Sequence, residues 1–156
     1  MITRSPHALL LLGLLCTTLS GAAIAATPDL SGVWRSIDDN TGNPKSIIRI
    51  DKTSEGKYGG TVLKVLAEPG AKPEVYCHDC PAPFTGKPIE GMSILWGLKE
   101  DQTDPNLYAG GRVLDPLSGN TYSAKITLDP SGKKLVLRGF MGISLLGRSQ
   151  VWYREQ

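Results

Sequence analysis

The stretch DLSGVWRSIDD, residues 29–39, guides our interpretation of the rest of the chain. It contains a Gly-x-Trp strand, and a matching strand with the sequence RSQVWYR occupies residues 148–154. Between the two lie short β-rich runs separated by turn residues. Strands that carry Trp and Arg near both ends of a β-rich chain predict a sheet that closes into a barrel.

The residues before this stretch have the pattern of a secretory signal peptide. Arg4 supplies a positive charge, residues 8–15 are apolar, and Ala23-Ile24-Ala25 forms a small-x-small cleavage site. The apolar run is shorter than the roughly 20 residues that a transmembrane helix needs. We therefore expect a cleaved leader over residues 1–25, one domain over residues 26–156, no transmembrane segment, and a periplasmic location.

Composition and motifs argue against several classes of function. The formal net charge is +2, and basic and acidic residues are interspersed, so the sequence has no basic stripe of the kind that binds nucleic acid. It contains no Gly-x-Ser-x-Gly elbow, no Walker loop and no Rossmann fingerprint. We predict no catalytic residues, no cofactor and no nucleic-acid partner, and we favour a non-catalytic role over an enzyme.

The strand pattern predicts an all-β fold. The 18 glycines and 11 prolines punctuate the chain, and no apolar pattern of period 3.6 is sustained. About eight strands joined by short connections predict a single antiparallel up-and-down β-barrel, a size that leaves room for side chains or one small ligand. The expected strands are residues 33–37, 46–51, 58–66, 92–98, 107–114, 121–128, 134–140 and 151–154.

Residues 67–90 interrupt the strands. Five prolines exclude a long helix or a central strand here, so we predict an irregular loop that contains Cys77-His78-Asp79-Cys80. In an oxidising compartment a disulfide between Cys77 and Cys80 is the first interpretation. A redox motif and a metal site are the alternatives. The prolines that follow oppose the helix that a thioredoxin-like cysteine needs, and we predict no metal because the motif offers too few ligands.

A barrel of this size suggests a small apolar or amphipathic ligand. Arg49 and Arg138 lie within strands and would hold a carboxylate or phosphate if they pointed inward, although outward, solvated arginines are the alternative. The residues assigned to ligand contact are Trp34, Arg49, Arg138, Phe140, Arg148, Trp152 and Arg154.

The loop at residues 141–146 is unusually apolar for a hairpin tip. It either covers one end of the barrel or forms an exposed contact patch. The competing functional hypothesis follows from the second option. In that hypothesis the barrel is filled, and the protein is an interaction or structural component of the envelope that docks through its exposed loops.

Two resemblances support the barrel prediction. Gly32-Val33-Trp34, followed by a late strand arginine, resembles the lipocalin-like (calycin) pattern, in which the tryptophan closes one end of the barrel and the arginine packs across its ring. Arg148 and Arg154 both suit that role, and a core tryptophan in another β fold is the alternative.

The chain as a whole resembles the exported bacterial family called domain of unknown function 2147. The matching pieces include Gly32-Val33-Trp34, Cys77-x-x-Cys80, Leu114-Asp115-Pro116, Leu137-Arg138-Gly139-Phe140 and Gln150-x-Trp152-x-Arg154. The resemblance implies a fold and a compartment. It implies no catalytic residues, because the activity of that family is unknown.

Overall fold

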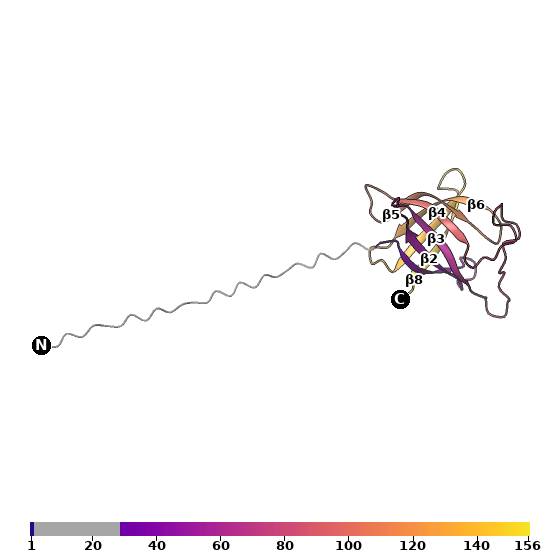
Figure 1. Cartoon of the computed structure of the whole chain (residues 1–156), viewed down its shortest axis with the longest axis horizontal. Coiled ribbons are helices and arrows are strands. Elements are labelled where there is room, and N and C mark those ends of the chain that lie inside the picture. The colour runs from indigo at the N-terminus through magenta and orange to yellow at the C-terminus, as the bar shows by residue number, and fades with distance from the viewer. Residues whose placement is uncertain (2–28) are drawn as a thin grey trace.

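The protein forms a closed barrel of eight antiparallel strands in a computed structural model that describes residue 1 and residues 29–156 (Figure 1). Each strand pairs with the next in sequence, and β8 pairs with β1 to close the barrel. The predicted up-and-down barrel is therefore confirmed. The strands are β1 (Gly32–Ile37), β2 (Pro44–Lys52), β3 (Tyr58–Val65), β4 (Ser93–Glu100), β5 (Leu107–Leu114), β6 (Thr121–Leu128), β7 (Lys134–Phe140) and β8 (Gly147–Arg154).

The expected and observed strands differ mainly at their ends. β8 begins at Gly147 rather than at Val151, because it pairs with β7 along its whole length, from Gly147 opposite Phe140 to Tyr153 opposite Lys134. Apart from Met1, the leader predicted over residues 1–25 lies outside the described residues. Within the described part of the chain no helix is long and apolar enough to cross a membrane.

One end of the barrel is closed by Trp34. Its side chain is fully buried, its indole Nε1 donates a hydrogen bond to the Leu30 carbonyl oxygen at 3.0 Å, and the Arg154 guanidinium lies 4.2 Å from its ring centre. Arg154 also donates hydrogen bonds of 2.5–2.6 Å to the carbonyl oxygens of Asp29, Ser31 and Gly132. Arg154, and not Arg148, is therefore the arginine that packs across the tryptophan.

The same contact explains why a glycine precedes the tryptophan in the Gly-x-Trp strand. Gly32 has a φ of +138°, a backbone conformation that L side chains rarely adopt, and a Cβ at this position would overlap Nη1 of Arg154. The burial of Arg154 lowers its pKa, and its three carbonyl partners compensate the desolvated charge with hydrogen bonds.

Apolar side chains fill the half of the barrel next to the closed end. Tyr58 and Tyr108 pack edge to face there, with ring centres 5.1 Å apart. Ile50, Leu98, Ile126, Leu128 and Leu135 are each at most 1 % exposed. This half is a conventional packed core.

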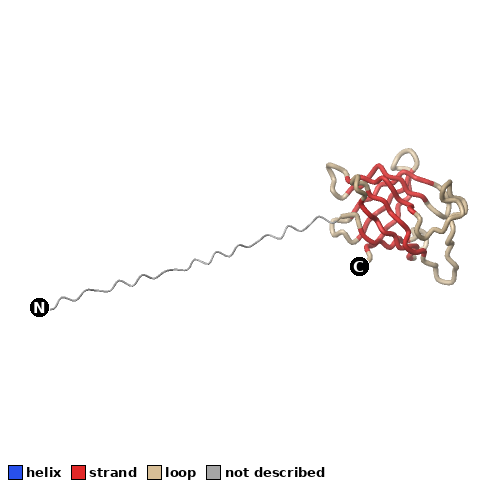
Figure 2. Tube along the Cα trace, in the orientation of Figure 1, coloured by secondary structure: helices blue, strands red, loops and turns tan. Residues whose placement is uncertain are grey.

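The opposite end, which we call the mouth, gathers four loops. Because successive strands alternate in direction, the loops at residues 38–43, 66–92, 115–120 and 141–146 all emerge at that end (Figure 2). The longest of them, residues 66–92, is called the strap below. It corresponds to the Pro-rich, Cys-containing loop predicted from the sequence.

The strap is attached to the loop between β5 and β6 through its cysteines. Cys77 and Cys80 lie at disulfide-bonding distance, with Cα atoms 5.5 Å apart, and both are buried. Sγ of Cys77 lies 3.2 Å from the carbonyl oxygen of Pro116. A Cβ at Gly119 would overlap the carbonyl oxygen of Asp79, so the close approach of the two loops requires glycine there.

Candidate functional site

The half of the barrel next to the mouth is hollow. A cavity of about 850 Å³ begins there and opens between the mouth loops. Ser36 and Trp152, which pair across β1 and β8, line the cavity, whereas the next inward pair toward the closed end, Trp34 and Arg154, does not. The floor of the cavity therefore lies at the level of Ser36 and Trp152.

Most of the cavity wall is apolar. Ile48, Val62, Ile94, Val113 and Leu137 line it from β2, β3, β4, β5 and β7. They are apolar side chains that these five strands present to the cavity. Such a wall suits an apolar body, since burial of apolar surface is favourable by about 25 cal/mol per Å².

Polar groups form a strip on the wall made by β1, β2 and β8. The hydroxyl oxygens of Ser36 and Ser46 lie 2.7 Å apart. On β8 the indole Nε1 of Trp152 donates a hydrogen bond to Oε1 of Gln150 at 3.3 Å. Ser36, Ser46, Gln150 and Trp152 all line the cavity, so its interior has one polar side and one apolar side.

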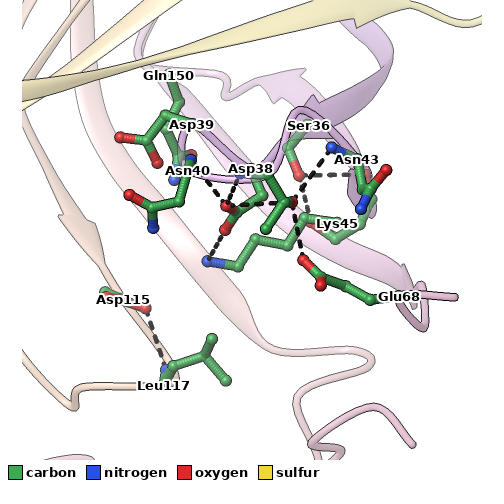
Figure 3. A network of polar contacts seen from close by, with 12 residues as sticks. Ser36, Asp38, Asp39, Asn40, Asn43, Lys45, Glu68, Asp115, Leu117 and Gln150 are labelled. Carbon is green, nitrogen blue, oxygen red and sulfur yellow. Dashed lines mark hydrogen bonds and ion pairs between the residues drawn. The ribbon is translucent and has the colours of Figure 1, made fainter. Parts of the chain in front are cut away.

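Charged residues surround the entrance, and most of them stabilise the mouth loops. The carboxylate of Asp38 accepts hydrogen bonds from the backbone N–H groups of Asn40 and Thr41 at 2.9 and 3.0 Å, and Lys45 lies 3.7 Å away (Figure 3). Burial alone would raise the pKa of Asp38, but these donors and the positive charge of Lys45 lower it overall.

Arg148 lies at the same rim, at the start of β8. Its side chain is 61 % exposed and forms an ion pair with Asp39 in the loop between β1 and β2. The hydrogen bond and the charge of Asp39 raise the pKa of Arg148. The pair connects the loop after β1 to the start of β8 across the junction where the barrel closes.

The seven residues predicted to contact a ligand fall into two groups. Phe140, Arg148 and Trp152 line the cavity. Trp34 and Arg154 lie below its floor and close the barrel, as described above. Arg49 and Arg138 also lie outside the cavity lining, and their role as ligand contacts has no support from the position of either side chain.

The two strand arginines have different structural surroundings. Arg49 is more than half exposed and forms an ion pair with Asp51, its neighbour two residues along β2, at 3.2 Å. Arg138 holds the loop at residues 141–146 by donating to the carbonyl oxygens of Ser144 and Leu145 at 2.6 and 2.9 Å, and it donates to the Ser149 hydroxyl at 2.9 Å. Arg138 therefore fixes the backbone of that loop.

The loop at residues 141–146 presents aliphatic side chains to solvent. Met141, Ile143, Leu145 and Leu146 are 61–82 % exposed. Met141 and Leu146 also line the cavity. The loop thus forms an exposed apolar part of the rim rather than a cover that buries its own side chains.

Ser36, Ser46 and Gln150 are not among the residues that the sequence predicted for the site. Strand periodicity contains the signal that finds them, because Ser36 lies two residues after the inward Trp34 and Gln150 two residues before the inward Trp152. Polar residues at such positions lie inside the barrel. In the described range 29–156 no group of three or more His, Cys, Asp or Glu side chains is placed to hold a metal ion.

Comparison with known proteins agrees with this architecture. The profile of the family described as "Uncharacterized protein conserved in bacteria (DUF2147)" matches residues 32–154. The chain belongs to the DUF2147 family. The match extends from the first strand of the barrel to the end of the last one, so it covers the cavity, the mouth loops and the closed end.

A solved structure shares the fold of this DUF2147 chain. Its title reads "Protein HP1028 from the human pathogen Helicobacter pylori belongs to the lipocalin family". The TM-score is 0.69 at 18 % sequence identity, and the alignment covers 83 % of this chain and 85 % of the other. The similarity establishes a lipocalin-like fold. No curated protein matches this chain.

Proposed function

We propose that this protein binds one small apolar or amphipathic molecule, without catalysis, in the hollow half of its barrel. The observation that carries the proposal is the cavity of about 850 Å³ between the packed core and the mouth. Its volume lies within the range of roughly 300–1,000 Å³ that is typical of small-molecule sites. The lipocalin-like architecture supports the same role, because an eight-stranded barrel has space for one small ligand.

The lining indicates what such a molecule has to satisfy. The apolar wall accommodates a hydrocarbon body, and the polar strip and the charged rim suit a polar group at one side or end. The polar groups described so far stabilise the loops or pair with one another, which supports a binding role over a reactive one.

We also propose that the protein acts in the periplasm after removal of residues 1–25. The leader pattern of the sequence supports export. The Cys77–Cys80 pair, buried between the strap and the loop after β5, suits an oxidising compartment, in which disulfides form and persist.

Docking of an envelope protein is the second candidate. The exposed aliphatic side chains of residues 141–146 favour it, because isolated soluble proteins rarely expose such a cluster. In this alternative the loop binds a partner and the cavity stays without a specific ligand.

Native mass spectrometry of protein purified from the periplasm tests ligand binding and export. For the binding function we expect an extra mass that is lost on denaturation. We also expect the denatured chain to start after residue 25 and to be two hydrogens lighter than the dithiol form. A bare mass that persists even after incubation with apolar compounds would contradict ligand binding, and a chain that retains its leader would contradict export.

A cavity-filling variant makes the test specific. Gly139 lines the cavity, and a Cβ there would be in ordinary contact, at 3.5 Å, with Tyr122 and Val113. We expect Gly139→Leu to weaken binding of an apolar fluorescent dye by about tenfold or more, which corresponds to roughly 1.4 kcal/mol. Val136→Leu, on the same strand but outside the cavity lining, is the matched control and should bind the dye like the wild type.

A further inference from the structure

The side-chain amide of Gln150 has a defined orientation on the polar wall of the cavity. Its Oε1 accepts the hydrogen bond from the Trp152 indole at 3.3 Å. An indole N–H is a donor and never an acceptor, so the amide oxygen has to face Trp152. The amide nitrogen, with its two N–H donors, is consequently turned away from Trp152.

The nitrogen of Gln150 is available to a ligand. Among residues 29–156 it has no hydrogen-bond partner. Every fully buried side-chain nitrogen or oxygen in this part of the chain does have a partner, so the Gln150 nitrogen is not fully buried. Gln150 itself is half-buried and lines the cavity. Its N–H donors are therefore reached from the cavity and not sealed within the wall.

Many of the oxygen acceptors around the cavity, in contrast, already accept hydrogen bonds from the protein. Asp38, Glu68 and Asp115 accept hydrogen bonds at the rim: Asp38 from Asn40 and Thr41 of its own loop, Glu68 of the strap from Thr41, and Asp115 from Leu117 (Figure 3). Asp115 also accepts from Ser118, and Glu74 accepts from Tyr76. Deeper inside, the hydroxyl of Ser36 is directed at the carbonyl oxygen of Ser46 at 3.3 Å and at its hydroxyl at 2.7 Å.

Lys45 adds a second donor at the rim. It lines the cavity, and its Nζ lies 3.7 Å from the Asp38 carboxylate, which is longer than a hydrogen bond. The cavity thus offers N–H donors without a hydrogen-bond partner to an incoming molecule, whereas many of its oxygen acceptors already accept hydrogen bonds in the loops and in the serine pair.

We propose that the ligand is an amphipathic molecule with an oxygen group that accepts hydrogen bonds, a carbonyl or a carboxylate, and that Gln150 donates to this group. The inference rests on the binding function proposed above and adds the chemical class of the ligand. The apolar body packs against the wall formed by Ile48, Ile94 and Val113. A primary ammonium group is disfavoured at this position, because donors would then face donors and remain unpaired.

Three probes with the same hydrocarbon chain test the proposal, namely dodecanoate, methyl dodecanoate and dodecylamine, each titrated by calorimetry below its micellar concentration. We expect the two oxygen-headed probes to bind the wild type at least about tenfold more tightly than the amine. Tighter binding of dodecanoate than of its ester would assign the group as a carboxylate, with Lys45 as its counter-charge. The reverse order would assign it as a neutral carbonyl.

The substitution Gln150→Glu removes the donors and keeps the oxygen that Trp152 needs. We expect it to weaken the oxygen-headed probes by about tenfold and to strengthen the amine. Gln102→Glu, in an exposed turn at the closed end, introduces the same charge away from the cavity and should change neither affinity.

The outcomes separate this inference from the proposed function. If the three probes bind the wild type equally, or if Gln150→Glu leaves the oxygen-headed probes unchanged, the acceptor class is wrong and the cavity remains a binding site. If none of the probes and no apolar dye binds the wild type, the binding function itself is wrong. The comparison of probes on the wild type needs no variant, so it stands even if Gln150→Glu folds poorly.

Discussion

Arg154 connects the segment before β1 to the last strand at the closed end of the barrel. Its guanidinium covers the Trp34 ring at 4.2 Å and donates hydrogen bonds to three carbonyl oxygens, two of which precede β1 and one of which belongs to the turn between β6 and β7. The planar fork of an arginine suits this arrangement, because its donors point in several directions within one plane.

We therefore expect Arg154→Ala to lower the free energy of unfolding by about 3 kcal/mol, since hydrogen bonds to a charged group and the contact with the Trp34 ring are lost together. Arg154→Lys keeps the charge but loses the fork, and we expect a loss of about 2 kcal/mol. Urea denaturation followed by tryptophan fluorescence measures both variants.

Arg49→Ala is the matched control for these arginine variants. Arg49 is exposed, and its ion pair with Asp51 lies on the surface, so the loss should be within about 0.5 kcal/mol. An Arg154→Lys variant as stable as the wild type would contradict the role assigned to the guanidinium.

At the residue scale the sequence identified the right residue types but not every position. Arg148 and Arg154 lie on the same face of one strand, so periodicity alone does not distinguish them. The register between β1 and β8 does, because it places Arg154 opposite Trp34. Gln150 is not predicted for a related reason. The orientation of its amide depends on the hydrogen bond from the indole of Trp152, a contact that composition and spacing do not reveal.

At the scale of elements, the loop at residues 141–146 is held open by a side chain from the strand before it. Arg138 on β7 donates to the carbonyl oxygens of Ser144 and Leu145. These contacts orient the backbone so that the apolar side chains of the loop remain in solvent at the rim. The sequence predicted an apolar tip, and Arg138 explains why this tip does not collapse into the cavity.

We expect Arg138→Ala to loosen this loop while the barrel stays folded. The amide of Leu146, which donates to the carbonyl oxygen of Ile143 at 3.1 Å, should exchange its hydrogen about tenfold faster, as NMR would measure. The free energy of unfolding should fall by about 1–2 kcal/mol. Arg112→Ala, at an exposed position of β5, serves as the control, and equal exchange rates in the two variants would contradict the role of Arg138.

The strap shows the limit of sequence reasoning for an element. Its prolines predicted an irregular loop, and the expected oxidising compartment favoured a disulfide between Cys77 and Cys80. Its position depends on contacts with residues far away in the sequence, namely Pro116 and Gly119 in the loop after β5. A propensity argument describes local conformation, so it does not specify such a partner.

At the scale of the whole molecule, the barrel combines a packed core with a hollow. The sequence predicted the number of strands and the closure, because both follow from local patterns and from the Trp- and Arg-bearing strands near the ends. Whether the barrel is filled was left open. Whether the barrel is filled depends on the summed volume of the inward side chains at each height along the barrel axis. The change from packed core to cavity occurs between the height of Trp34 and that of Ser36.

Two isoleucines on opposite sides of this boundary lead to the last prediction. Ile126 on β6 is fully buried in the packed half and does not line the cavity, whereas Ile94 on β4 is 6 % exposed and does line it. Truncation of a buried side chain costs the lost transfer free energy plus a further cost for the new cavity. Ile94 already borders empty space, so it has fewer contacts to lose.

We accordingly expect Ile126→Ala to lower the free energy of unfolding by about 3–4 kcal/mol and Ile94→Ala by about 1–2 kcal/mol, measured by urea denaturation without ligand. Saturation with an apolar ligand should reduce this difference, because Ile94→Ala then also loses contacts with the ligand, whereas Ile126 contributes nothing to the site. Equal losses for the two variants without ligand would mean that the half next to the mouth is packed like the rest of the core, and the ligand-binding interpretation would then lose its structural basis.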